Sequence, residues 1–227
     1  MRESNREKRS SRSGKGPSMD REPVRSTKLI ILARHGETVS NRDGLIMGQS
    51  DSELTSRGLA AVKALAEKLT LHRPRVIYAS SLGRAVSSAK IYSEKLGIPI
   101  VMREALIELS SGAWTDKTRD EVVRGRRHIR TSWTDRPPGG ESYQDAESRV
   151  FTLITEIEAD KGSKIALVVG HASVNRVFLK LWLELEPDIA LRVNVPHDSV
   201  YLLEPYGRVA VLDHAGAMKR GLTFVEG

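Results

Sequence analysis

Leu29-Ile30-Ile31-Leu32-Ala33-Arg34-His35-Gly36-Glu37-Thr38 is the stretch that decides the fold of this chain. Five apolar residues without a polar interruption are typical of a strand buried on both faces of a parallel sheet. The strand ends at an arginine, a histidine and a glycine, and ligands of open α/β sheets bind outside the carboxyl ends of the strands. The stretch therefore predicts an α/β fold with an anion-binding crevice at this edge.

Two further apolar runs end in the same way. The run 76–79 leads into Ser80-Ser81-Leu82-Gly83-Arg84, where a serine can cap a helix and the arginine lies in its first turn. The run 165–170 is followed at once by His171. Because parallel strands end at one edge of a sheet, the side chains after them should converge on one anion. They are Arg34, His35, Arg84 and His171.

Apolar residues at helical spacing alternate with these strands. The pattern predicts helices over about 56–72, 81–96, 142–157 and 172–182, another helix opening at Thr118, and a terminal strand pair at 200–203 and 209–212. Such alternation is typical of a three-layer α/β/α sandwich with a mostly parallel central sheet. We expect a small helical cap to be inserted at about 103–145.

The basic charge of the chain is concentrated at its N-terminus. Residues 1–28 hold nine Lys and Arg against four Asp and Glu, so only +2 of the net charge of +7 falls on residues 29–227. We predict a disordered basic tail over 1–27, with Met19 as an alternative start, and one domain over 28–227. The nearly neutral domain is not expected to bind nucleic acid; an interaction arm is the alternative role of the tail.

Composition excludes several other classes of protein. No apolar run approaches the roughly 20 residues of a membrane helix, so no membrane association is expected. The chain has no cysteine, which removes disulfides and thiolate nucleophiles and fits a reducing, cytoplasmic location.

An ordered set of motifs follows the opening stretch. It comprises Arg34-His35-Gly36-Glu37-Thr38, Asn41, Gln49, Asp51, Leu54-Thr55, Gly58, Ser81-Leu82-Gly83-Arg84-Ala85, Glu108, Gly112, Trp114, Gly140-Glu141-Ser142 and Gly170-His171. From about Lys28 to Leu212 the set resembles the histidine phosphatase superfamily, the phosphoglycerate-mutase-like group with its Arg-His-Gly motif.

The resemblance implies a role for each matching residue. His35 would be the nucleophile that becomes a phosphohistidine, and Glu108 would protonate the leaving alcohol and then activate water. The phosphoryl oxygens would be held by Arg34, Arg84 and His171. The resemblance implies no metal and no cofactor, and it adds contacts with phosphate or substrate at Asn41, Thr38 and Gln49. Arg126 and Arg127 of the expected cap suggest a contact with a second anion or a carboxylate, against the alternative of a solvated helix face.

Three departures from the family pattern bear on the substrate. Thr115-Asp116 follows Trp114 where the family often has Glu-Gly, Ala172-Ser173 follows His171 where it often has Gly-Gly, and Glu53 stands where proline is usual. The first two lie beside the expected pocket. They leave the identity of the substrate open.

We therefore predict a metal-independent phosphomonoesterase that hydrolyses a small phosphorylated metabolite, as a monomer or a homodimer. The first alternative is a 2,3-bisphosphoglycerate-dependent phosphoglycerate mutase. Only 62 residues separate Glu108 from His171, which favours hydrolysis because family mutases usually carry longer insertions over the site. The second alternative is a non-catalytic phosphate-binding interaction protein.

Overall fold

The computed structural model describes residues 26–123 and 130–225. Its strands form one seven-stranded sheet in the order β3-β2-β4-β1-β5-β6-β7. Their bounds are β1 Leu29–Arg34, β2 Val76–Ala79, β3 Ile100–Met102, β4 Ile165–Gly170, β5 Ser199–Leu203, β6 Val209–Asp213 and β7 Met218–Arg220. The apolar runs of β1 and β4 lie at the centre of this sheet, where strands are covered on both faces.

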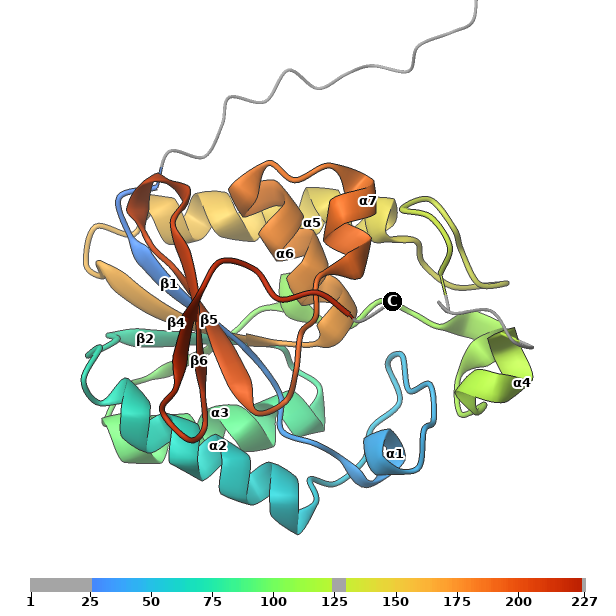
Figure 1. Ribbon diagram of the computed structural model, residues 1–227, viewed down its shortest axis with the longest axis horizontal. Helices are drawn as coiled ribbons and strands as arrows, with labels where there is room; N and C mark the ends of the chain where they lie inside the picture. Colours follow the sequence, from blue (N-terminus) through green and yellow to red (C-terminus); the bar gives the residue numbers. More distant parts are fainter. Residues whose placement is uncertain (1–25, 124–129, 226–227) are drawn as a thin grey trace, which may run out of the picture.

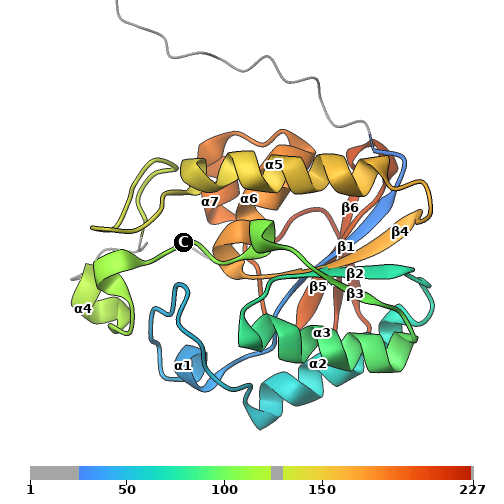
Figure 2. The same ribbon diagram turned by 180° about the vertical axis from the view of Figure 1, so that it is seen from behind.

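Helices cover both faces of the sheet and make the three layers that the sequence predicts (Figure 1). One layer holds α2 Ser56–Leu69 and α3 Gly83–Leu96; the other holds α5 Tyr143–Ala159, α6 Ala172–Leu183 and α7 Pro187–Arg192. Figure 2 shows the same layers from behind. Each face has its own apolar core, with Val62 and Tyr92 on one side and Val150 and Phe178 on the other. The α/β class is confirmed.

The expectation of a mostly parallel sheet is wrong, because the sheet is evenly mixed. The strand pairs β3-β2, β2-β4 and β4-β1 are parallel, whereas β1-β5, β5-β6 and β6-β7 are antiparallel. After α7 the chain returns to the edge where β1 ends, so β5 starts there and runs in the opposite direction. The connections from β5 to β6 and from β6 to β7 are short, and short connections join antiparallel strands only.

Short elements gather past the carboxyl ends of the parallel strands. They are α1 Val39–Arg42, α4 Arg119–Val123 and the 3₁₀ turns η1 Glu104–Leu106 and η2 Gly112–Trp114; a further turn, η3 Pro205–Gly207, joins β5 to β6. Leu45 and Thr118 form an isolated bridge that ties the α1 loop to the start of α4, and both views show these segments together. The helix expected at Thr118 is confirmed as α4, while the cap as a separate unit stays a prediction.

The turn after β1 packs tightly on the start of α2. A Cβ on Gly58 would lie 2.2 Å from the backbone oxygen of Glu37, so only glycine allows this approach. The contact fixes the direction in which the chain leaves His35.

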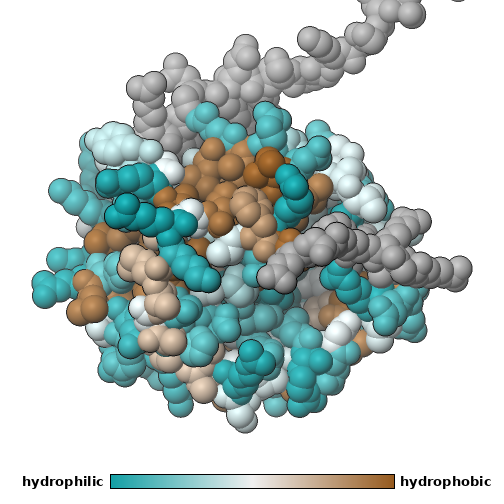
Figure 3. Space-filling model, in the orientation of Figure 1, coloured by the Kyte–Doolittle hydropathy of each residue, from teal (hydrophilic) through white to brown (hydrophobic). Residues whose placement is uncertain are grey.

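The surface in the view of Figure 3 is largely hydrophilic, with a hydrophobic patch near its top. Within the two described ranges no helix combines the length and the apolar character needed to cross a bilayer.

Candidate active site

His35 lies immediately past β1, and its imidazole is held in one tautomer. The side chain is 2% exposed. Its Nδ1 lies 2.8 Å from the backbone oxygen of Gly36; because a carbonyl only accepts, Nδ1 carries the proton and donates. Nε2 of the neutral ring is then an unprotonated acceptor, and it receives a 3.2 Å hydrogen bond from Nε of Arg84. Nε2 therefore offers the lone pair that a nucleophile needs.

His171 lies beside His35, at the end of the neighbouring strand β4. The two ring centroids are 5.0 Å apart, and His171 is fully buried. Its Nε2 lies 2.8 Å from Oγ of Ser80, which already accepts from the backbone N–H of Leu82, so the hydroxyl proton can be donated to the imidazole. This arrangement leaves a proton on Nδ1, which is buried and has no hydrogen-bond partner among the described residues.

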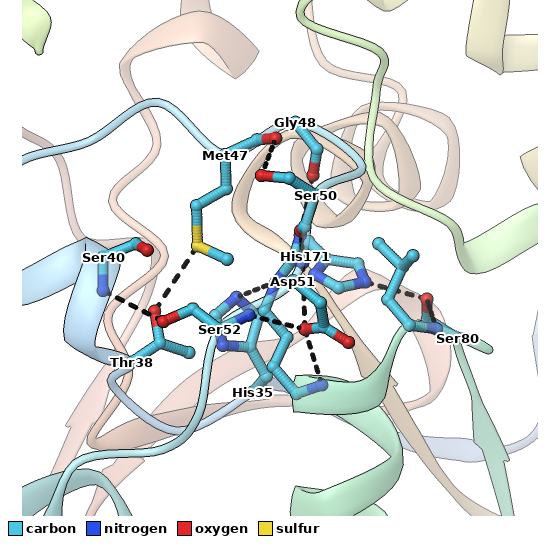
Figure 4. A network of polar contacts seen from close by, with 12 residues as sticks. His35, Thr38, Ser40, Met47, Gly48, Ser50, Asp51, Ser52, Ser80 and His171 are labelled. Atoms are coloured by element: carbon cyan, nitrogen blue, oxygen red, sulfur yellow. Dashed lines mark hydrogen bonds and ion pairs between the residues drawn. The ribbon is translucent and has the colours of Figure 1, made fainter. Parts of the chain in front are cut away.

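Arg84, in the first turn of α3, connects the nucleophile to the loop 47–51. Its Nη1 donates to the carbonyl of Ser50 at 2.5 Å, and its Nη2 donates to that of Gly48 at 2.8 Å. Asp51 accepts the backbone N–H of Arg84 at 3.1 Å and thereby caps α3. Figure 4 shows Asp51 in the network of polar contacts that contains His35 and His171. A Cβ on Gly83 would lie 2.2 Å from Oδ2 of Asp51, which explains the glycine beside the arginine. The guanidinium is thus fixed beside His35 before any anion arrives.

Arg34, the last residue of β1, supplies a second guanidinium. Its Nη1 donates to the carbonyl of Val195 at 3.0 Å, whereas its buried Nε lacks a partner within the described residues. Burial lowers the pKa of Arg34 to about 10, although the charge of Glu108 opposes that effect. Arg34 therefore remains a cation at neutral pH, and its buried Nε donor is unused within the described residues.

Glu108 caps the helix that follows His171. Its Oε1 accepts the backbone N–H of Val174 and its Oε2 that of Ser173, both at 3.1 Å, and Oε1 also accepts the N–H of Leu109 at 2.9 Å. The first turn of α6 has no capping side chain of its own, so the carboxylate satisfies donors that would otherwise be orphaned. Glu108 is held at the cavity by backbone groups.

Arg34, His35, Arg84 and Glu108 border a cavity of about 260 Å³, whereas His171 packs against His35 and is not among the lining residues. Its walls also contain apolar residues of the loop 45–47, and the lining side chains that can donate or accept are Arg34, His35, Asn41, Arg84, Glu108, Ser111, Arg119, Arg130 and Ser173. Four of them are cations and one is an anion. In the described part of the chain, no three His, Cys, Asp or Glu side chains form a group that could hold a metal ion.

The expected substrate contacts differ in their placement. Asn41 lines the cavity and forms a capping box with Thr38 at the start of α1. Thr38 is fully buried and Gln49 donates to the carbonyl of Glu108 at 3.0 Å, and neither lines the cavity. Arg126 and Arg127 lie outside the described residues. These substrate contacts stay predictions.

His197 is the main residue at the site that sequence reasoning missed. It matches no motif of the sequence and was given no role there, but its Nδ1 lies 2.8 Å from the backbone oxygen of His35. Antiparallel pairing of β1 with β5 brings it there, with Ala33 opposite Val200. No local sequence signal reveals this placement, because it depends on the antiparallel pairing of β5 with β1.

The buried histidines predict a pH dependence of stability. Burial lowers the pKa of His35 and of His171 well below the ordinary value, and it lowers that of His197 to about 3. Below about pH 6.5 the unfolded chain therefore binds more protons than the folded chain, so stability falls as the pH falls. Between pH 6.5 and 5.5 we expect a loss of about 1 kcal/mol for each of the three histidines, measured by urea unfolding.

Two variants control this measurement. His197→Asn should reduce the loss by about a third, whereas His214→Gln, outside the site, should leave it unchanged. A free energy of unfolding that stays constant over this pH range would contradict the assignment of three neutral imidazoles.

Comparisons with known proteins agree with this geometry. A model of the histidine phosphatase superfamily (branch 1) matches residues 30–217. The metal-independent phosphoserine phosphatase of Arabidopsis thaliana is 28% identical over 205 residues, which cover 85% of this chain and 86% of that protein. The 2,3-bisphosphoglycerate-dependent phosphoglycerate mutase of a Methylobacterium strain is 31% identical over 185 residues, which cover 74% of this chain and 89% of that protein.

The fold has solved counterparts. The structure of mycobacterial glucosyl-3-phosphoglycerate phosphatase with VO3 matches with a TM-score of 0.70 at 22% identity, covering 88% of this chain and all of that chain. This likeness at 22% identity shows the fold alone. The family model shows the family as well, since it matches residues 30–217. The chain belongs to the histidine phosphatase superfamily, branch 1.

Proposed function

We propose that the chain is a metal-independent phosphomonoesterase that acts through a phosphohistidine at His35. The observation that carries the proposal is a pair of buried donors without described partners, Nε of Arg34 and Nδ1 of His171, beside an imidazole whose Nε2 is unprotonated. Buried donors are almost always paired, and a phosphoryl group at the cavity would supply oxygens to both.

The first step would transfer the phosphoryl group to the enzyme. A bound phosphoryl oxygen would replace Nε2 of His35 as the acceptor of the Arg84 Nε–H, which frees the Nε2 lone pair to attack phosphorus in line with the leaving oxygen. The N–P bond forms, the P–O bond to the alcohol breaks, and Glu108 donates a proton to the leaving oxygen. The guanidiniums and His171 stabilise the charge spread over the three equatorial oxygens.

The second step would return the enzyme to its starting state. Water attacks phosphorus as Glu108 takes its proton, the N–P bond breaks, and inorganic phosphate leaves. The proton that Glu108 takes from water regenerates the acid that the first step requires.

The cavity supports a small, acidic leaving group. Its volume of about 260 Å³ lies near the lower end of the roughly 300–1,000 Å³ of typical ligand pockets, which favours a small substrate. Arg119 and Arg130 add positive charge to its wall, and relatives are named for phosphoserine and for phosphoglycerate, both carboxylic acids. We therefore propose that the substrate is the phosphate ester of a small carboxylic acid.

Substrate pairs test this proposal directly. 3-Phosphoglycerate and glycerol 3-phosphate differ by one carboxylate, so with EDTA present we expect phosphate release from the former with about tenfold higher kcat/KM, and turnover of phosphoserine. The ratio corresponds to about 1.4 kcal/mol of binding in the transition state. Equal kcat/KM values would contradict the acidic leaving group, and activity that EDTA abolishes would contradict metal independence.

The mutase is the second candidate, because the Methylobacterium relative matches at 31% identity over most of its length. It shares the phosphohistidine but returns the phosphoryl group to a phosphoglycerate. A coupled assay with 2,3-bisphosphoglycerate decides between them: interconversion of 3- and 2-phosphoglycerate faster than phosphate release would overturn the hydrolase.

The proposal also covers the oligomeric state and the cellular compartment of the enzyme. It acts on a small molecule as a monomer or homodimer in the cytoplasm, and the lack of cysteine supports a reducing compartment.

A further inference from the structure

A third imidazole lies against the nucleophile, from a segment that does not line the cavity. His197 precedes β5, and its ring centroid is 5.1 Å from that of His35 at an interplanar angle of 63°. The ring of His35 is thus flanked by His171 and His197, each about 5 Å away. His197 itself does not line the cavity, and its described contacts are with His35.

The hydrogen bond of His197 acts on the backbone of the nucleophile. Its Nδ1 lies 2.8 Å from the carbonyl oxygen of His35, and because that oxygen only accepts, Nδ1 carries a proton and donates. The backbone N–H of His35 donates to Gly170 at 3.0 Å, so both polar groups of this peptide segment are anchored to other elements of the sheet edge. The imidazole direction is fixed in turn by the 2.8 Å bond from Nδ1 to Gly36.

The imidazole of His197 is neutral at neutral pH, because its pKa is lowered to about 3. Burial is the main cause that lowers the pKa of its imidazole; the positive charges of Arg34, Arg57 and Arg84 act in the same direction, and the His35 carbonyl opposes them. A second proton on the ring would add one more cation to a site already rich in guanidiniums. A neutral imidazole instead supplies a fixed N–H donor and an aromatic surface.

We infer that His197 is a positioning residue that holds the Arg34-His35-Gly36 turn so that Nε2 of His35 points into the cavity. This inference rests on the proposed function, because it assigns Nε2 as the attacking atom. Misplacement of a reacting group by about 1 Å can cost a factor of about 100 in rate, whereas the affinity for phosphate depends on other side chains. Loss of His197 should therefore act on kcat and spare KM.

Amide side chains distinguish the two nitrogens of this imidazole. The amide of asparagine occupies nearly the same place as Nδ1 of histidine, while the amide of glutamine occupies that of Nε2. We expect His197→Gln and His197→Phe to lower kcat for p-nitrophenyl phosphate about 10- to 100-fold with KM within threefold. His197→Asn, which restores the donor, should recover kcat to within about threefold of wild type.

Controls separate positioning from folding. His72→Gln, a histidine after α2 and away from the cavity, should match wild type. Inorganic phosphate binding to each His197 variant, measured by calorimetry, should stay within threefold of wild type and reports a folded site. Wild-type kcat in His197→Gln would overturn the inference, as would equal losses in the Asn and Gln variants or a matching rise in KM. If wild type itself releases no phosphate, the proposed function fails instead, so the two failures are distinguishable.

Discussion

Replacing His35 with alanine is expected to reduce phosphate release by a factor of about 10⁴ or more. The variant lacks the imidazole whose Nε2 offers a lone pair at the cavity, and no other described side chain stands in that place. Removal of a covalent nucleophile typically costs such factors, because the arginines alone bind the ester without opening the two-step route. Steady-state release of phosphate from p-nitrophenyl phosphate and phosphoserine, with EDTA present, measures the effect.

The controls for this variant address folding and specificity. His35→Ala should still bind inorganic phosphate, since Arg34, Arg84 and His171 remain, and binding can be followed by calorimetry. His214→Ala, with a half-exposed side chain paired loosely with Asp198, should keep full activity. Retention of more than about a tenth of wild-type activity in His35→Ala would show that His35 is not the nucleophile.

The second large effect is expected for Glu108→Gln. An amide has one oxygen and cannot supply a proton, so the variant loses the acid and disturbs the acceptors for Ser173 and Val174. For phosphoserine, whose alkoxide leaves only with a proton, we expect kcat to fall about 10²- to 10⁴-fold. For p-nitrophenyl phosphate the leaving group needs no proton, so the first step should survive while water attack is slowed.

This difference gives the variant a kinetic signature. With p-nitrophenyl phosphate, Glu108→Gln should release a burst of about one equivalent of nitrophenolate per enzyme and then turn over slowly. Glu141→Gln is the matched control, because Glu141 accepts from Ser110 and Arg149 and does not line the cavity. Equal rate losses with both substrates and no burst would show that Glu108 acts only as a cap of α6.

The strands and their ends were predictable because their signals are local. An uninterrupted apolar run predicts a buried strand, and parallel strands must end together, so Arg34, His35 and His171 were placed correctly at one edge. The family resemblance added Glu108, which stands in a loop without a periodic signal. The family match confirms the expected histidine phosphatase and its phosphatase chemistry.

The features that the sequence did not reveal depend on contacts between segments that are distant in the sequence. The antiparallel direction of β5 is set by the path of the chain after α7, which no local pattern encodes, and His197 was missed for that reason. Arg84 was expected simply to grip an anion, yet carbonyls of the loop 47–51 also bind it. These bonds join residues more than 30 positions apart, beyond the reach of spacing rules.

Trapping the phosphoryl group on the enzyme tests the central claim most directly. Glu108→Gln is mixed with p-nitrophenyl phosphate, quenched in alkali, where a phosphohistidine survives, and digested for mass spectrometry. The account predicts one added phosphoryl group on the peptide that contains His35, and none in the His35→Ala, Glu108→Gln double variant. A burst of nitrophenolate with the phosphoryl group on another residue, or with none on the protein, would contradict it.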